Sequence, residues 1–239
     1  MATVFEWGSG SLPGTPTGGI SVDGSIGQPA APSIEIAQTS GNPARTNIPV
    51  SLTGVSSTRF YFRTPSAWGG SAAGIFNLNS APGTIAWQLT LAGGGAPGQY
   101  RIVRDGGPAV YSSSTGTLAF DTWYRAEVRH DPANEAVEVD VFPATGTTPI
   151  DSGSGSHANL GSVGTQIIIG RNNSSPTLNT FYIDSITVTD TFGLIGEYVE
   201  PDPPSGLQVS VWNGTDELPA TVSVWNGTDE VPATIDAVN

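Results

Sequence analysis

The stretch Ala136-Val-Glu-Val-Asp-Val-Phe142 alternates three valines with two acidic residues. Successive side chains of a β-strand point to opposite faces of its sheet, so this alternation predicts a strand that buries its valines and exposes its carboxylates. The stretch Arg59-Phe-Tyr-Phe-Arg63 has the same period, with both phenylalanines on one face and the arginines and tyrosine on the other. Both stretches therefore indicate strands that pack against a core on one side.

Similar stretches recur along the chain, separated by turns rich in Gly, Pro and Ser. The thirty-one Gly and nineteen Pro disfavour helices, and no long stretch has helical apolar spacing. So many short strands predict an all-β fold, a two-sheet antiparallel jelly-roll sandwich. The candidate strands are Ser33–Ala37, Ile48–Leu52, Arg59–Arg63, Gly74–Leu78, Ile85–Leu91, Gln99–Val103, Trp123–His130, Ala136–Phe142, Gln166–Gly170 and Phe181–Thr189.

Four motifs of the second half resemble those of a known family in their order. They are Thr122-Trp-Tyr-Arg-Ala-Glu-Val-Arg129, Val137–Phe142, Gln166-Ile-Ile-Ile-Gly170 and Phe181-Tyr-Ile-Asp-Ser-Ile-Thr-Val188. This series is similar to that of the concanavalin A-like, or laminin G-like, jelly roll, over roughly residues 33–195. The resemblance implies the same sandwich fold.

The C-terminus contains one 13-residue unit twice, at 209–221 and 222–234, with Leu218 against Val231 as the single difference. Asn-Gly between β-prone runs predicts that each unit is a hairpin, and one hairpin alone is marginally stable. The apolar side of each hairpin therefore needs a partner. We expect these residues to serve assembly: Trp212, Asn213, Gly214, Trp225, Asn226 and Gly227.

The composition divides the chain into four parts. Residues 1–32 are predicted to form a Gly/Pro-rich arm, residues 33–198 the jelly roll, residues 199–208 a Pro-rich linker, and residues 209–239 the repeats. Phe5 and Trp7 either tuck into the chain's own domain or dock on a neighbouring subunit.

The net charge of the chain limits the kinds of partner that it can bind. The eight arginines, absent lysines and 21 acidic residues give a formal net charge of −13, which disfavours binding to nucleic acid. No cysteine is present, so thiolate metal sites are excluded. The N-terminus lacks the features of a signal peptide, and no run is long and apolar enough to insert in a membrane.

Catalysis and calcium binding are both weighed against simpler roles. Retaining glycosidases need two carboxylates about 5 Å apart, and the related glucanases carry them on one strand as Glu-x-Asp-x-Glu. A second spacing, Glu-x-Asp-x-x-Glu, also occurs in them. Here Glu138 and Asp140 are followed by Phe142 and Pro143, one of which replaces the needed second Glu in either spacing, so we expect no enzyme activity. No cofactor is expected, and the available oxygen ligands for Ca²⁺ more often cap turns. These calcium candidates are Asp121, Asp184 and Asn172.

A sugar site needs an exposed aromatic platform beside planar polar groups. The candidates for such a site are Trp68, Arg59, Tyr61, Arg63 and Tyr111. The alternative is that Trp68 caps the edge of the sandwich and the arginines pair with carboxylates.

The repeats resemble those of minor tail and other virion proteins of actinobacteriophages. This resemblance implies a virion structural protein made in the host cytoplasm, a minor tail protein in preference to a capsid decoration protein. Its expected partners are other virion proteins, further copies of the chain (a trimer favoured) and host-surface glycans. The alternative from another class is a stand-alone carbohydrate-binding module or a divergent glycosidase.

Overall fold

The computed structural model describes most of the chain as two compact units, residues 1–197 and residues 198–239. Each unit is considered by itself. The described residues are 3–8, 11–27, 32–37, 44–67, 72–81, 84–92, 95–104, 107–170, 180–198, 221–225 and 230–234.

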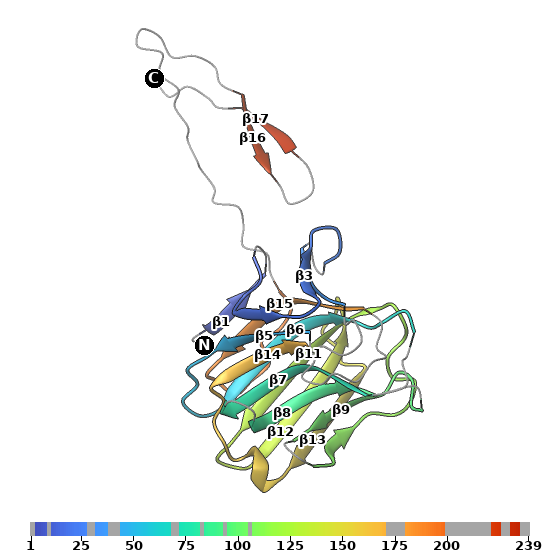
Figure 1. Ribbon diagram of the computed structural model, residues 1–239, viewed down its shortest axis with the longest axis vertical. Helices are drawn as coiled ribbons and strands as arrows, with labels where there is room; N and C mark the ends of the chain where they lie inside the picture. Colours follow the sequence, from blue (N-terminus) through green and yellow to red (C-terminus); the bar gives the residue numbers. More distant parts are fainter. Residues whose placement is uncertain are drawn as a thin grey trace. The chain divides into compact units, whose positions relative to one another are not determined.

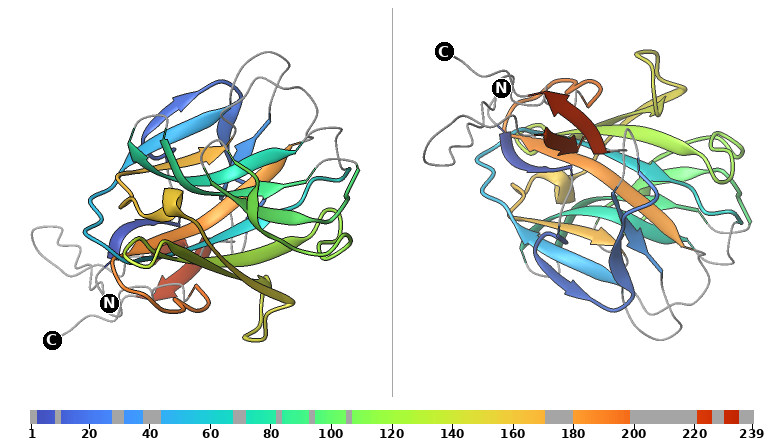
Figure 2. Two further views of the ribbon diagram at one scale, coloured as in Figure 1. Left: turned by 90° about the horizontal axis from the view of Figure 1, so that it is seen from below. Right: turned by 90° about the horizontal axis from the view of Figure 1, so that it is seen from above.

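Two antiparallel sheets, which we call sheet A and sheet B, form the first unit as stacked layers (Figures 1 and 2). Sheet A has the strand order β13 (Asp151–Ser156), β12 (Ala136–Pro143), β11 (Trp123–Asp131), β6 (Ser56–Arg63), β15 (Phe181–Thr189), β4 (Ser33–Ile36) and β3 (Ile20–Asp23). In the same sheet β1 (Thr3–Trp7) pairs with the second half of β15. Sheet B, which faces the viewer in Figure 1, has the order β10 (Ala109–Ser112), β9 (Tyr100–Val103), β8 (Thr84–Leu91), β7 (Ala73–Ala81), β14 (Gln166–Gly170), β5 (Arg45–Pro49) and β2 (Thr15–Thr17). The predicted all-β sandwich is therefore confirmed.

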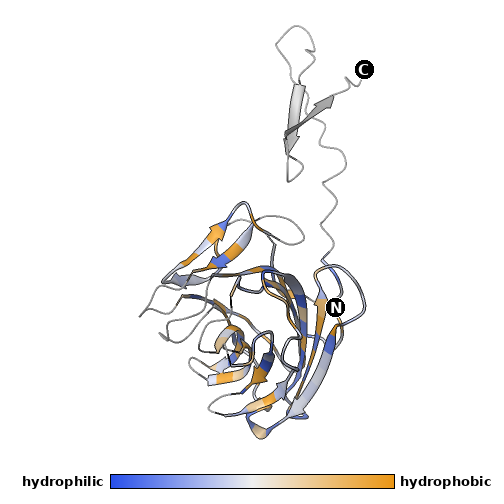
Figure 3. Ribbon diagram, turned by 90° about the vertical axis from the view of Figure 1, so that its right-hand side faces the viewer, coloured by the Kyte–Doolittle hydropathy of each residue, from blue (hydrophilic) through white to orange (hydrophobic). Residues whose placement is uncertain are grey.

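The core lies between the sheets and contains the inward-facing half of each strand. Phe60 of β6 stacks on Phe76 of β7 across the two layers, with ring centroids 4.4 Å apart, and Phe76 in turn stacks on Trp87 of β8. The three valines of β12 are buried in the same core, as their alternation predicts. Figure 3 shows apolar and polar segments alternating along the strands. Alternation thus fixes which side chains remain on the two outer faces.

The first residues of the chain belong to the sandwich and do not form the arm that their composition predicts. β1 pairs with β15, β2 pairs with β5, and β3 pairs with β4. Trp7 is only 6% exposed, its indole N–H donates to Ser11 O at 3.1 Å, and Phe5 packs against the core. Between the two alternatives for these aromatics, both residues tuck into their own domain.

The edge strands β10 and β13 close one side of the sandwich. Tyr100 and Tyr111 each donate a hydrogen bond to Asp151 Oδ2 at 2.8 Å. Burial, with help from this donation, raises the pKa of Tyr111 to about 12, so its hydroxyl stays a donor at neutral pH. The Tyr111 ring lies where a side chain at Gly153 would be, 2.1 Å from the position of an added Cβ. Gly153 therefore permits the close approach of the two edges.

The second unit contains one hairpin among its described residues. β16 (Thr221–Trp225) and β17 (Glu230–Thr234) pair antiparallel, and both strands lie within the second 13-residue repeat and the residue before it. Trp225 is the last residue of β16. The other repeat residues predicted for assembly lie outside the described residues: Trp212, Asn213, Gly214, Asn226 and Gly227.

In the part of the chain that the structure describes, no helix has the length and apolarity to span a membrane. The described helical structure is limited to a single 3₁₀ turn, η1 (Ala158–Leu160).

Replacement of Gly153 by Ala tests the closed edge. Overpacking against the Tyr111 ring costs about 1–3 kcal/mol, which exceeds the roughly 0.5–1 kcal/mol that Ala gains over Gly in a strand interior. Chemical denaturation should therefore show a lower free energy of unfolding. Ser154→Ala, on the exposed face of the same strand, should stay within about 0.5 kcal/mol of the parent. Equal stabilities of the two variants would contradict this role of Gly153.

Candidate functional site

Many of the chain's charged residues lie on the strands of sheet A. Four arginines and nine acidic residues lie on the strands of this sheet, and several pair directly across neighbouring strands. Arg129 Nε contacts Glu138 Oε2 at 2.9 Å, and another of its guanidinium nitrogens contacts Asp140 Oδ2 at 2.7 Å. The two carboxylates weighed as glycosidase residues are thus both ion-paired with one arginine. Phe142, in place of the missing Glu, lies under the Arg125 guanidinium at 4.1 Å.

A segment of residues 190–197, which we call the strap, covers the centre of the outer face of this sheet. Ile195 N–H donates to Glu127 Oε2 at 2.7 Å, and Gly196 N–H donates to Glu127 Oε1 at 3.2 Å. Arg59 donates to the carbonyl of Gly196 at 3.2 Å and to Thr187 Oγ1 at 2.5 Å. At the other end, Ser57 Oγ donates to Thr191 O at 2.7 Å. Sheet A thus holds the strap by hydrogen bonds from buried polar groups.

Two of the predicted sugar-binding residues are out of reach of a ligand. Arg59 is 4% exposed and Tyr61 is 2% exposed. Burial lowers the pKa of the Arg59 guanidinium from its ordinary value, with Tyr61 and Glu127 acting against this effect. Arg59 and Tyr61 therefore do not form an open platform, because both side chains are buried and Arg59 is bonded to Gly196 of the strap.

Beyond the strap, one row of outward-facing residues crosses five strands of sheet A. In the register of the sheet, Trp123 lies opposite Arg63, Arg63 opposite Tyr182, and Tyr182 opposite Glu35, which lies opposite Ser21. We call these five residues the aromatic row. Trp123, Arg63, Tyr182 and Glu35 are half-buried, and Ser21 is exposed. At a strand spacing of about 4.8 Å, the row is about 19 Å long.

The row combines aromatic faces with planar polar groups. The Arg63 guanidinium carbon lies 5.7 Å from the Tyr182 ring centroid, within the range of a cation–π contact. Ser21 Oγ donates to Glu35 Oε2 at 3.1 Å. Burial raises the pKa of Tyr182, and the nearby carboxylates of Glu35 and Asp23 raise it further. Its hydroxyl therefore remains a hydrogen-bond donor at neutral pH.

The turn before β11 fixes one end of the row. Thr64 Oγ1 donates to Ala119 O at 2.8 Å and accepts from Thr122 N–H at 3.0 Å. Asp121 in this turn has a φ of 50°, a left-handed conformation that Asp tolerates. This turn places Asp121 Oδ1 3.0 Å from Arg63. Arg63 Nε is buried and has no hydrogen-bond partner within the described part of the chain.

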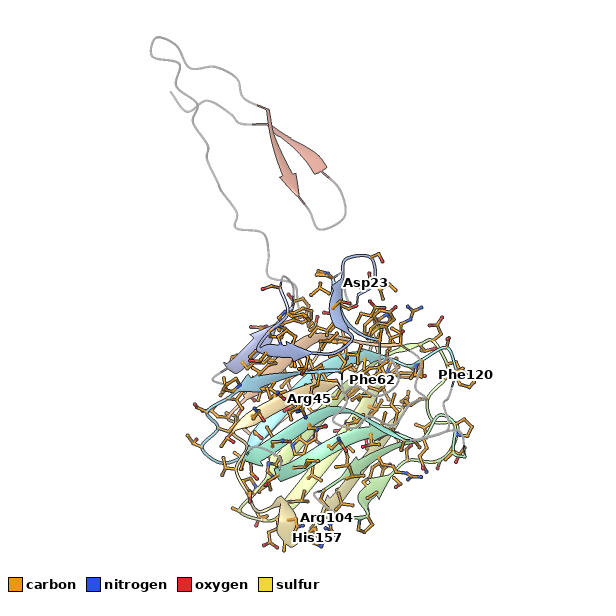
Figure 4. All side chains as sticks on the ribbon, in the orientation of Figure 1. Asp23, Arg45, Phe62, Arg104, Phe120 and His157 are labelled. Carbon is orange, nitrogen blue, oxygen red and sulfur yellow. The ribbon has the colours of Figure 1, made fainter. Side chains whose placement is uncertain are left out.

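Exposed side chains continue the row at the same turn. Phe120, labelled in Figure 4, is 51% exposed, and the Asp121 side chain is 57% exposed. Trp68, the predicted aromatic platform, lies in the segment after β6 and outside the described residues. Tyr111 lies on β10 of the other sheet and holds the closed edge, so the structure does not bring it to the row. Among the predicted sugar-binding residues that are described, only Arg63 belongs to the row.

The two calcium candidates that the structure describes have different partners. Asp121 pairs with Arg63, whereas Asp184 is fully buried and accepts from Ser185 N–H at 2.6 Å. Asn172 lies outside the described residues. Within the described ranges, no group of three or more His, Cys, Asp or Glu side chains is placed to hold a metal ion. We therefore propose no calcium site through these residues.

Sequence reasoning used Trp123 and Tyr182 only as markers of the fold. Both residues sit in the motifs that carry the family resemblance, one at the start of β11 and the other near the start of β15. Their alternation with buried Tyr124 and Ile183 was a signal that they face outward. The sequence did not show that β11, β6 and β15 are neighbouring strands. This strand order brings together residues that are far apart in the chain.

Comparison with known proteins supports the fold. No protein-family model matches the sequence, and no curated protein matches it. Among solved structures, the botulinum neurotoxin serotype D binding domain gives a TM-score of 0.51 at 9% identity, over 74% of this chain and 43% of that chain. Botulinum neurotoxin type C, described as interacting with two ganglioside molecules, gives 0.53 at 9% identity over the same shares. Lectin II from Ulex europaeus gives 0.50 at 11% identity, over 79% of this chain and 99% of that chain.

This chain therefore spans less than half the length of the neurotoxin chains that it matches. At these identities the similarity defines the class of fold, a jelly-roll β-sandwich, and nothing finer.

Substitution of Glu127 tests how the strap is held. Arg125 Nε contacts Glu127 Oε1 at 3.0 Å, and both side chains are buried. Glu127→Gln leaves Arg125 buried without this carboxylate, so we expect the free energy of unfolding to fall by about 3–5 kcal/mol. Hydrogen exchange at the amides of Ile195 and Gly196 should accelerate in the same variant. Glu197→Gln, which loses a contact of a 40% exposed side chain, should cost under about 1 kcal/mol. Unchanged protection of both amides in Glu127→Gln would contradict the account.

Proposed function

We propose that this protein is a virion structural component whose jelly roll binds neutral glycans along the aromatic row. The observation that carries the binding proposal is the placement of Trp123 and Tyr182 on either side of Arg63, on one open sheet face. Sugar rings stack their C–H faces on aromatic rings, while guanidinium and carboxylate groups bind hydroxyls. The row supplies both kinds of group in one line.

The charges beside the row favour a neutral sugar over an acidic one. Arg63 is already paired with Asp121, and Glu35 lies on the other side of Tyr182. An acidic sugar would meet these carboxylates, whereas a neutral hexose chain would find acceptors for its hydroxyls. The buried Arg63 Nε–H provides a further donor at the floor of the row.

The fold comparisons are compatible with glycan binding in general and do not indicate a neutral or an acidic sugar. One matched neurotoxin structure concerns ganglioside interaction, and another match is a lectin. Glycan binding is thus compatible with this architecture. The assignment to this chain rests on its own aromatic row.

The virion role rests on the C-terminal repeats. A 13-residue unit that forms a hairpin is marginal by itself, so attachment to another chain would stabilise it. We place the protein as a minor tail protein that the repeats hold in the particle, as a homo-oligomer with a trimer favoured. The jelly roll then presents its row toward glycans of the host surface. Capsid decoration is the alternative placement.

A glycan array with the full chain tests the row. We expect binding to neutral oligosaccharides, weakened at least tenfold by Trp123→Ala and by Tyr182→Ala, because loss of a stacked ring removes about 1.4 kcal/mol or more. Phe192→Ala removes an aromatic ring that is 45% exposed on the strap, outside the row, and should bind as the parent does. Equal losses in all three variants, or no glycan bound by the parent, would overturn the proposal.

Removal of residues 201–239 tests the attachment role. The truncated protein should retain its folded sandwich, because unit 1 is compact by itself, and should be missing from purified particles. Its unfolding transition provides the control for folding. Normal incorporation of the truncated protein would show that the repeats are not the attachment element.

A further inference from the structure

The charged residues of the sandwich are divided unequally between its sheets. The strands of sheet A carry nine acidic residues and four arginines. The seven strands of sheet B, as the structure describes them, carry Arg45 and Arg101 and no acidic residue. The chain has a formal net charge of −13, whereas the charged residues on the strands of sheet B are all positive. Figure 4 labels Arg45 on the sheet that faces the viewer.

Amide side chains line the centre of the outer face of sheet B. In the register of the sheet, one row runs from Asn47 through Ile168 and Asn77 to Gln88 and Val103. Gln166 and Asn79 lie opposite one another one step further along. We call Asn47, Asn77, Asn79, Gln88 and Gln166 the amide cluster.

The two arginines belong to the adjacent row, at its two ends. Arg45 lies opposite Gly170, and Arg101 lies opposite Thr90, which lies opposite Gly74. Small residues therefore separate the arginines across five strands, a span of about 19 Å. The Gln88 amide fills the space above Gly74, since its Nε2 is 1.9 Å from where a Cβ would be. Gln88 Nε2 also donates to Asn77 Oδ1 at 2.7 Å.

Part of the amide cluster has unused hydrogen-bonding capacity. Asn77 and Asn79 are fully buried. Within the described residues, Asn77 Nδ2 and both polar atoms of Asn79 have no hydrogen-bond partner. Buried polar groups are nearly always satisfied, so such atoms call for an explanation. A ligand that draws the half-buried Gln88 side chain outward would open this second layer of donors and acceptors.

We infer that the outer face of sheet B binds an acidic polysaccharide, a sugar chain bearing carboxylates. Amides pair with sugar hydroxyls as both donors and acceptors, and arginines bind carboxylates through two parallel N–H groups. The face has no outward aromatic side chain on β5, β14, β7, β8 or β9, which disfavours a protein partner, because protein interfaces concentrate binding energy in aromatic anchors. Two arginines are also few for a nucleic-acid backbone.

The net negative charge of the chain does not prevent this binding. The Debye length is about 8 Å at physiological ionic strength. Acidic groups on sheet A lie on the far side of a core about 10 Å thick, so they are farther from a ligand on sheet B than Arg45 and Arg101 are, and salt weakens the part of their field that passes through solvent. The two local arginines therefore determine the potential at this face. This site is independent of the aromatic row and does not rest on the proposed function.

Titration calorimetry of the full chain with sodium alginate, a uronic acid polymer, tests the inference. We expect binding that Arg45→Gln and Arg101→Gln each weaken about tenfold, and that Gln88→Ala weakens without any change of charge. Arg104→Gln removes the same unit of charge at the turn after β9, where the Arg104 guanidinium lies over Gly107. This matched control should bind alginate as the parent does.

Each outcome of the calorimetry either supports or overturns the inference. Loss of affinity in the three face variants, with unchanged thermal unfolding and intact Arg104→Gln binding, supports it. Absence of alginate binding by the parent overturns it, and so does an equal loss in Arg104→Gln, which would indicate diffuse charge attraction. Neutral dextran is titrated in parallel. It distinguishes binding at this site, which requires carboxylates on the sugar, from binding at the aromatic row, which is proposed to take neutral sugars. A failure of the row on the glycan array leaves the alginate result unaffected.

Discussion

The stack of Phe60 on Phe76 joins the two sheets, and the rest of the structure depends on this contact. These residues lie on β6 and β7, consecutive strands that belong to opposite layers. A buried aromatic side chain removes about 150–250 Å² from water, which corresponds to several kcal/mol at about 25 cal/mol/Å². Because the core fixes the inward residues of each strand, it also fixes the outward ones. The register that buries Phe60 and Phe62 turns Arg59, Tyr61 and Arg63 outward.

The outer faces then differ according to what covers them. On sheet A the strap provides hydrogen-bond partners for Glu127 and Arg59. It leaves the aromatic row uncovered. On sheet B the described strands carry amides and arginines and no carboxylate. One sandwich thus presents two surfaces of different chemistry. One has aromatic rings beside ion pairs, and the other is rich in amides, some of whose buried atoms have no partner among the described residues. We propose that both surfaces bind sugars and that their charges favour different kinds of sugar.

Local pattern predicted the strands where apolar and polar residues alternate. The bounds of β14 and β15 agree with the sequence-based prediction, and the other long strands agree within a few residues. The predicted strand Ile48–Leu52 was misplaced, since β5 spans Arg45–Pro49. β13, with the sequence Asp-Ser-Gly-Ser-Gly-Ser, was missed because it has no apolar side chain to alternate. β1 to β3 were missed because each is short and is flanked by segments rich in Gly and Pro, whose composition indicated an irregular arm.

The candidate site was less predictable, because it depends on contacts between distant residues. The sequence showed that Arg59, Tyr61 and Arg63 share a face, and it could not show that two of them are buried or that residues 190–197 bond to Arg59. The pairing of Trp123, Arg63, Tyr182 and Glu35 likewise follows from strand order. Charge segregation between the sheets was present in the sequence, although it has meaning only once the strands are assigned to sheets.

The central claim is that the two outer faces recognise sugars independently, and an NMR titration of the ¹⁵N-labelled full chain tests it most directly. Alginate should shift the side-chain amide signals of Gln88 and Gln166 and leave the Trp123 indole N–H unchanged. A neutral oligosaccharide that binds on the array should shift the Trp123 signal and leave those amides unchanged. If both ligands shift the same signals, or neither shifts any of them, the account of two distinct faces is contradicted.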